Sequence, residues 1–209
     1  SVGGTGKTPM IEYLITLLGS KYKLATLSRG YGRKSKGFMI ATSNVSSQDI
    51  GDEPLQIFNK FKTITVAVDA DRQNGLKTLK HNNPSLDVVL LDDAFQHRKV
   101  TAGFNILLTA YNQLYCDDFV LPTGNLREPR SGAKRAQVIV VTKCPENLSD
   151  LEKNKIKTRL NPKSNQGVFF STIQYSETLK SSTSTRTLKD LKGTHFTLVT
   201  GIANPIPLV

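Results

Sequence analysis

Residues 1–8 of the 209-residue chain read Ser-Val-Gly-Gly-Thr-Gly-Lys-Thr. The phosphate-loop pattern is GxxxxGK followed by Ser or Thr; Gly6, Lys7 and Thr8 match its end, and Ser1 replaces its first glycine. Glycines let backbone N–H groups curl around a phosphate, the lysine reaches the β- and γ-phosphates, and the threonine hydroxyl binds Mg²⁺. A glycine-rich turn with a chance Lys-Thr pair is the alternative. The residues predicted to bind a nucleotide are Ser1, Val2, Gly3, Gly4, Thr5, Gly6, Lys7 and Thr8.

A second motif is an apolar strand that ends in carboxylates. Residues 86–93 read Leu-Asp-Val-Val-Leu-Leu-Asp-Asp. Ligands of parallel sheets bind at the carboxyl ends of the strands, so Asp92 and Asp93 are placed to hold Mg²⁺ directly or through water. A strand followed by an ordinary acidic turn is the alternative. The phosphate loop upstream favours the metal-binding interpretation.

Short apolar runs alternate with helix-type stretches along the chain. Continuous apolar runs are typical of strands buried on both faces. We therefore predict an α/β fold of the P-loop NTPase type, with a mostly parallel sheet, helices on both faces and right-handed crossovers. The predicted strands are 23–28, 38–42, 63–68, 86–92, 104–110, 137–143, 168–175 and 195–200, and the predicted helices are 6–18, 54–61, 72–80 and 149–160.

The character of the sequence changes near residue 145. We predict a P-loop kinase core over residues 1–145 and a smaller, partial α/β portion over residues 146–209. Within the latter, residues 176–187 are polar and rich in Ser and Thr, which predicts a loop or linker. A capping-box spacing from Ser149 to Glu152 marks a helix start.

The composition limits the class of protein. The net charge of +11 favours a polyanionic partner: nucleic acid, nucleotide phosphates or an anionic membrane face. Trp is absent and no stacking motif is visible, so we expect no nucleic-acid partner, and lipid and phosphate substrates explain the charge better. Two cysteines without a CxxC pair fit a reduced compartment. No apolar run approaches the roughly 20 residues that span a bilayer.

Three further polar positions have both a structural and a functional interpretation. Asp52 either caps the helix that begins near residue 54 or accepts a proton from an attacking hydroxyl, and the sequence by itself favours the cap. Arg72 either begins an ordinary helix or neutralises a transferring phosphoryl group. Arg29, in the basic glycine-rich segment 28–34, either faces solvent or lines a phosphate site.

Two more segments carry many functional side chains. Residues 92–98 contain Gln96 and His97 beside the two aspartates, although a histidine is more often structural than catalytic. Residues 121–136 contain Arg127 and further cations. This segment is either a basic surface or a loop that clamps a phosphate ahead of the strand 137–143.

Taken in order, these segments resemble the tetraacyldisaccharide 4'-kinase family, the lipid A 4'-kinases of Gram-negative bacteria. Ser1 in place of the first glycine is itself typical of this family. The resemblance covers the chain nearly end to end, over residues 1–9, 27–32, 51–54, 92–97, 121–129 and 200–205.

The resemblance implies ATP-dependent phosphorylation of the 4'-hydroxyl of a tetraacylated glucosamine disaccharide 1-phosphate, with ATP and Mg²⁺ as cofactors. Asp52 would then be the base. The resemblance also assigns phosphoryl-charge stabilisation to Lys7, Arg72 and Arg127, Mg²⁺ and its waters to Thr8, Glu53, Asp92 and Asp93, and the lining of the site to Arg29, Gln96 and His97.

Two family features are not seen in residues 1–209. Family members carry an N-terminal hydrophobic segment that docks on the inner membrane, and a C-terminal motif whose histidine partners the base. We therefore expect a fragment of a protein that works at the cytoplasmic face of the inner membrane. The rival hypothesis is a P-loop ATPase or GTPase switch, such as a metal-delivery protein, but neither a switch segment nor the base-reading Asn-Lys-x-Asp is visible.

Overall fold

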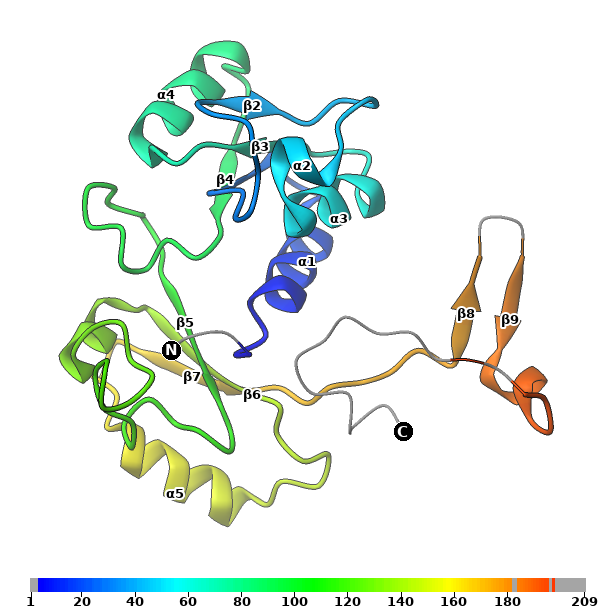
Figure 1. Ribbon diagram of the computed structural model, residues 1–209. Helices are drawn as coiled ribbons and strands as arrows, with labels where there is room; N and C mark the ends of the chain where they lie inside the picture. Colours follow the sequence, from blue (N-terminus) through cyan, green and yellow to red (C-terminus); the bar gives the residue numbers. More distant parts are fainter. Residues whose placement is uncertain (1–3, 182–183, 196, 198–209) are drawn as a thin grey trace. The chain divides into compact units, whose positions relative to one another are not determined.

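The computed structural model describes residues 4–181, 184–195 and 197 (Figure 1). The chain divides into two compact units, Ser1–Thr172 and Ile173–Val209. The division expected at residue 145 falls inside the first unit, because α5 (Asp150–Leu160) and β7 (Gly167–Phe170) pack against the strand that precedes them. The division of the whole protein into domains at residue 145 stays a prediction.

Four strands form the first sheet, in the order β2-β3-β1-β4. β1 pairs in parallel with β3 and with β4, and β2 is antiparallel to β3. Each strand lies within a range predicted from its apolar run, and the short β2 accounts for the single antiparallel pair. The bounds are β1 (Leu24–Ser28), β2 (Met39–Ile40), β3 (Thr65–Val68) and β4 (Val88–Leu91).

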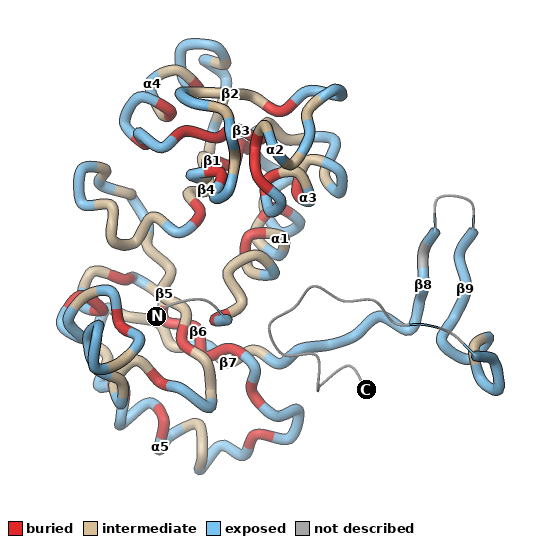
Figure 2. The backbone as a smooth tube through the Cα atoms, in the orientation of Figure 1, coloured by how far each residue is buried: buried red, intermediate tan, exposed pale blue. Residues whose placement is uncertain are grey.

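Helices cover both faces of this sheet, as the buried strands predicted. On one face Ile11 and Ile15 of α1 (Lys7–Leu18) and Ile57 of α3 (Asp52–Lys60) pack against β3. On the other face Leu79 of α4 (Arg72–Asn82) packs against Leu27 and its neighbours. Figure 2 shows the buried backbone concentrated on β1 and β3 between these layers.

The second sheet has the order β5-β6-β7, and all its pairs are parallel. Ile156 and Leu160 of α5 pack against Ile139 and Val141 of β6, which buries one face of the sheet. The new bounds are β5 (Ile106–Ala110) and β6 (Val138–Thr142). The mostly parallel α/β fold is thereby confirmed.

Local signals account for some helix starts and fail for others. The Ser149 hydroxyl accepts from the Glu152 N–H, and the Glu152 carboxylate accepts from the Ser149 N–H, so the predicted capping box of α5 is confirmed. The short helices α2 (Ser47–Ile50) and η1 (Arg130–Arg135) were not predicted, because four- and six-residue helices are too short to show a periodic apolar face.

The second unit contains a small hairpin. β8 (Thr178–Lys180) pairs antiparallel with β9 (Thr185–Thr187), and η2 (Leu188–Leu191) follows. The prediction of a loop over residues 176–187 is therefore wrong. All three residues of β9 are exposed, so the apolar alternation that signals a half-buried strand is absent. The predicted strand 195–200 lies largely outside the described residues.

No helix among the described residues is long and apolar enough to cross a bilayer.

Candidate nucleotide-binding site

The phosphate loop leads directly into α1. Gly6 is the N-cap residue, with φ +81°, and Lys7 is the first helical residue. The unpaired N–H groups at the start of a helix, together with its dipole, favour an anion at this position. A hydrogen bond also holds the loop against the second sheet: the Thr142 hydroxyl at the end of β6 donates to the Thr5 carbonyl at 2.9 Å. Residues 1–3 of the predicted loop lie outside the described residues.

Asp93 lies between two cations that were predicted to stabilise phosphoryl charge. Its carboxylate is 3.7 Å from Lys7 Nζ and accepts a hydrogen bond of 2.7 Å from Arg127 Nη1. Burial by itself would raise the pKa of Asp93, but the hydrogen bond from Arg127 and the charge of Lys7 outweigh it and hold the pKa below its ordinary value. The structure thus brings together three residues that are up to 120 positions apart in the chain.

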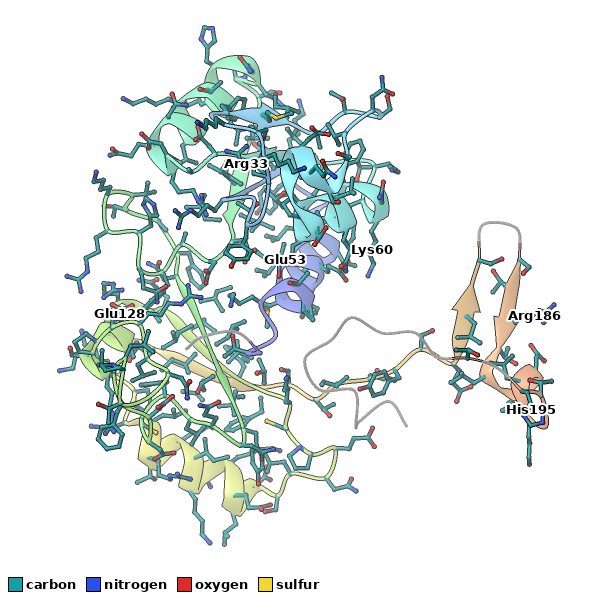
Figure 3. All side chains as sticks on the ribbon, in the orientation of Figure 1. Arg33, Glu53, Lys60, Glu128, Arg186 and His195 are labelled. Carbon is teal, nitrogen blue, oxygen red and sulfur yellow. The ribbon has the colours of Figure 1, made fainter. Side chains whose placement is uncertain are left out.

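Asp92 has the opposite surroundings. It is 8% exposed, and burial, followed by the charges of Glu53 and Asp93, raises the pKa of its carboxyl. Glu53, which is labelled in Figure 3, in turn accepts a hydrogen bond of 3.2 Å from the Thr8 hydroxyl. Excess negative charge beside a threonine hydroxyl is an environment that a divalent cation would stabilise.

The donor set fits Mg²⁺ better than a metal held by protein groups alone. Among the described residues, no cluster of three or more His, Cys, Asp or Glu side chains forms a complete metal site. Mg²⁺ usually takes one or two carboxylates and completes its octahedron with water and substrate phosphates. The assignment of Thr8, Glu53, Asp92 and Asp93 to Mg²⁺ stays a prediction.

Arg72 is the largest fully buried side chain among the described residues, at 1% exposed. One guanidinium nitrogen donates to the Asp69 carbonyl after β3, and the other donates to the Asp92 carbonyl after β4 at 3.3 Å. Burial lowers the pKa of the guanidinium, and the charge of Asp92 opposes that effect. Its Nε has no hydrogen-bond partner within the described chain.

Asp52 is exposed at the first residue of α3, and the N-cap is Gly51. The interpretation of Asp52 as the cap is therefore wrong, because the helix begins two residues earlier than predicted. Gly51 has φ +91°, and a Cβ there would lie 2.9 Å from the Tyr31 carbonyl; a Cβ on Gly30 would lie 2.8 Å from the Ile50 carbonyl. These two glycines let the basic segment that begins at Arg29 pack directly against the turn that carries Asp52.

Glu128 was not predicted to be a site residue, yet it organises the segment after Asp93. Glu128, which is labelled in Figure 3, accepts hydrogen bonds from Gln96 at 3.1 Å and from Arg135 at 2.9 Å. The Arg135 guanidinium also lies 4.6 Å from the centre of the Phe95 ring. The sequence signal that could have identified Glu128 is a carboxylate among several cations in residues 127–135. His97 lies in the same segment, and its buried Nδ1 has no partner among the described residues.

A known protein family matches the whole chain. The model of the tetraacyldisaccharide-1-P 4'-kinase family, LpxK, matches residues 1–209. The chain belongs to this family. The predicted resemblance is thereby confirmed over the full length of the chain.

Individual members of the family are closely similar. Tetraacyldisaccharide 4'-kinase of Flavobacterium johnsoniae is 53% identical over 207 residues, which is 99% of this chain and 61% of the relative. The kinase of Bacteroides thetaiotaomicron is 46% identical over 220 residues, covering all of this chain and 58% of the relative. The chain therefore spans about three fifths of the curated relatives that it matches.

A solved structure shows the same fold. The crystal structure of Aquifex aeolicus LpxK in complex with ATP has a TM-score of 0.61 and is 29% identical, covering 85% of this chain and 70% of that chain. The LpxK family is thus supported by sequence and by fold, and the proteins compared are kinases by name.

Proposed function

We propose that the LpxK protein to which this chain belongs transfers the γ-phosphoryl group of ATP to the 4'-hydroxyl of a tetraacyl glucosamine disaccharide 1-phosphate. The observation that carries the proposal is the pairing of Asp93 with both Lys7 and Arg127 at the start of α1. Two cations held beside a helix N-terminus match what a triphosphate and its transition state require.

Lys7 and Arg127 are proposed to stabilise the negative charge that develops during phosphoryl transfer. When the sugar oxygen bonds to the γ-phosphorus and the bond to the β,γ-bridging oxygen breaks, negative charge accumulates on ADP and on the equatorial oxygens. Lys7 and Arg127 lie where they can offset that charge. Mg²⁺, held by Thr8, Glu53, Asp92 and Asp93, would supply Lewis-acid stabilisation of the β- and γ-phosphates.

Asp52 is proposed as the acceptor of the hydroxyl proton. It is exposed, it is not used as a helix cap, and Gly51 brings it against the basic segment that contains Arg29. Arg29, Gln96 and His97 are proposed to line the sugar-phosphate side of the site. Because Arg72 is buried, we propose that it acts by holding the ends of β3 and β4 rather than by touching the phosphoryl group.

The substrate and the place of action are proposed with the reaction. The net charge of +11 supports an anionic lipid acceptor at the cytoplasmic face of the inner membrane, where acidic headgroups attract cationic surfaces. The rival, a P-loop ATPase or GTPase switch or a metal-delivery protein, has no support from the names of the relatives.

Transfer of radiolabel from γ-labelled ATP tests the proposal, with the whole protein and the tetraacyl disaccharide 1-phosphate in detergent. We expect label in the lipid only when the acceptor is present, and ³¹P NMR should place it at the 4'-position. Release of inorganic phosphate at the same rate without the acceptor, or a clear preference for GTP, would favour the switch hypothesis instead.

A further inference from the structure

A row of polar contacts joins α1 to α3. Near the start of both helices, the Thr8 hydroxyl donates to the Glu53 carboxylate. One turn further along α1, Glu12 accepts from the Gln56 side-chain amide at 3.0 Å and, with its other carboxylate oxygen, from the Lys60 ammonium. Figure 3 labels Glu53 and Lys60, which lie at opposite ends of α3. This polar row therefore runs from the candidate site to the far end of α3.

The helical spacing of these residues explains why they meet. Residues three or four positions apart lie on the same face of a helix. Thr8 and Glu12 are four positions apart on α1. On α3, Glu53, Gln56 and Lys60 follow one another at spacings of three and four. Because the contacts advance toward the carboxyl end on both helices, α1 and α3 run in the same direction, and both begin at the candidate site.

The apolar contacts of the two helices do not by themselves fix how far one helix lies along the other. Ile11 and Ile15 of α1 and Ile57 of α3 belong to one buried cluster. Apolar attraction is non-directional, and ridge-into-groove packing of helices leaves a scatter of about 15–20° in the crossing angle. Hydrogen bonds, in contrast, weaken steeply when their geometry changes. The polar row thus adds the directional constraint that the apolar cluster lacks.

Glu12 makes two of the three contacts in this row. Apart from Lys7, it is the only charged side chain of α1, and the Glu12 side chain is 16% exposed. Its two carboxylate oxygens bond to different residues, Gln56 and Lys60, which are four positions apart on α3. A carboxylate held at two points adds geometric specificity as well as energy. Glu12 therefore resists sliding of α3 along α1.

We propose that Glu12 is a positioning residue for phosphoryl transfer, which holds the start of α3 in register with the phosphate loop. The inference rests on the proposed function, in which α3 supplies the base Asp52 and the loop supplies Lys7. One residue of slip along a helix is about 1.5 Å, and a misplacement of about 1 Å can cost roughly 100-fold in rate. Glu12 lies more than a turn beyond Lys7 in α1, so it acts on the reaction through the two helices.

The positioning role separates turnover from stability and from nucleotide binding. The Lys60 side chain is 57% exposed, and exposed ion pairs contribute little to the free energy of unfolding. Lys7 and the amides at the start of α1 do not depend on α3 for their place in the phosphate loop. Loss of the contacts of Glu12 should therefore lower kcat, while the stability of the protein and its affinity for MgATP stay nearly unchanged.

Exchange of the two charges tests the proposal in the whole LpxK protein, with kcat measured on the tetraacyl disaccharide 1-phosphate and MgATP affinity by calorimetry. Glu12→Lys places two ammonium groups side by side and should lower kcat at least roughly tenfold. The double variant Glu12→Lys/Lys60→Glu should restore kcat to within about threefold of wild type, because the Gln56 amide carries both a donor and an acceptor. Glu146→Lys, at an exposed position, makes the same charge change and should keep the wild-type kcat.

Three results would overturn the proposal: a wild-type kcat in Glu12→Lys, a loss that the double variant does not restore, or a loss of MgATP affinity as large as the loss of kcat. Glu12→Gln covers the case in which Glu12→Lys does not fold. It keeps an acceptor for Gln56 but loses the charge that faces Lys60, so kcat should fall about threefold or more at unchanged MgATP affinity. A wild-type kcat in Glu12→Gln would also contradict the proposal.

Crystal structures of the same variants separate this inference from the proposed function. If the wild-type protein transfers no phosphate to the disaccharide, the proposed function fails, and the position of α3 decides the role of Glu12. In Glu12→Lys, the Thr8 hydroxyl should move beyond hydrogen-bond distance of Glu53, roughly 3.5 Å, and the double variant should restore the contact of 3.2 Å. An unchanged contact between Thr8 and Glu53 in Glu12→Lys would overturn the proposal.

Discussion

Asp92 and Asp93 are neighbours in sequence with opposite electrostatic surroundings. Asp93 is paired with Lys7 and Arg127, whereas Asp92 is buried beside Glu53 and Asp93 itself. The two cations stabilise the ionised form of Asp93. Burial and the neighbouring carboxylates destabilise the ionised form of Asp92, and a bound cation would offset this effect. We therefore propose that Asp93 positions Lys7 and Arg127 for phosphate binding. We propose that Asp92 contributes more than Asp93 to the binding of Mg²⁺.

Replacement of Asp92 by Asn tests this division. The change keeps the shape of the side chain but removes its charge, so we expect the Mg²⁺ concentration at half-maximal turnover to rise roughly tenfold or more, the scale of altered metal-site partners. Asp87→Asn, at the opposite end of the same strand, is the control and should leave the Mg²⁺ titration unchanged. Superimposable titrations of Asp92→Asn and wild type would exclude Asp92 from the metal site.

Asp52 can be tested against Asp49, three residues earlier. Asp52→Asn should lower turnover by roughly 100-fold or more, because an amide cannot accept a proton. Its stability should change by at most about 1 kcal/mol, since only a charge near a helix start is lost. Asp49→Ala should do the reverse: it removes the carboxylate that accepts from the Ser46 N–H and costs about 1 kcal/mol, with turnover kept. Urea unfolding and steady-state kinetics give both numbers, and an active Asp52→Asn enzyme would remove Asp52 as the base.

At the scale of elements, Arg72 connects strands that are not neighbours. It donates to carbonyls at the ends of β3 and β4, which lie on either side of β1. Arg72→Gln should therefore lower the free energy of unfolding by about 3–5 kcal/mol, the cost of disrupting a buried charge network. Arg72→Lys should not restore stability, because a single ammonium lacks the planar fork that reaches both carbonyls.

Arg98→Gln is the matched control, because the Arg98 side chain is 72% exposed and its ion pair with Glu128 is 3.7 Å long. It should change stability by less than about 1 kcal/mol. Arg72→Gln as stable as Arg98→Gln in urea unfolding would contradict the clamp between the two strand ends.

The elements show why sequence reasoning succeeded in one place and failed in another. Buried strands such as β6 were predicted to within a residue at each end, because a continuous apolar run has few alternative structures. The hairpin β8–β9 was missed, because Thr178, Leu179 and all three residues of β9 are exposed, so no buried apolar face marks these strands. Its pairing is set by backbone hydrogen bonds rather than by an apolar pattern.

Some contacts of the candidate site could also be predicted from the sequence, and others could not. Lys7 and Asp93 belong to local motifs, and their proximity follows from the topology of a parallel sheet. The contact between Glu128 and Gln96 could not be predicted, because the two residues are 32 positions apart and no local spacing encodes it. The cap assignment of Asp52 failed because Gly51, with its positive φ, is the N-cap residue and Asp52 is the first helical residue.

At the scale of the whole molecule, the junction between the two units is exposed. Residues 171–176 form neither helix nor strand, and Ile173 and Tyr175 are 47% and 56% exposed. Limited proteolysis of the whole protein with chymotrypsin should cleave first after Tyr175, since exposed, unpaired backbone is the preferred substrate of proteases. A first cleavage within the two sheets of the first unit would contradict the division at Thr172.

Calorimetric titration of MgATP into the whole LpxK protein tests the central claim most directly, which is that the phosphate loop and the residues around Asp93 form the nucleotide site. Lys7→Ala should weaken MgATP binding at least roughly tenfold, because a charge-assisted phosphate contact is lost. Lys80→Ala, an exposed lysine in the last turn of α4, should bind as wild type does. Equal affinity of wild type and Lys7→Ala for MgATP would contradict the account.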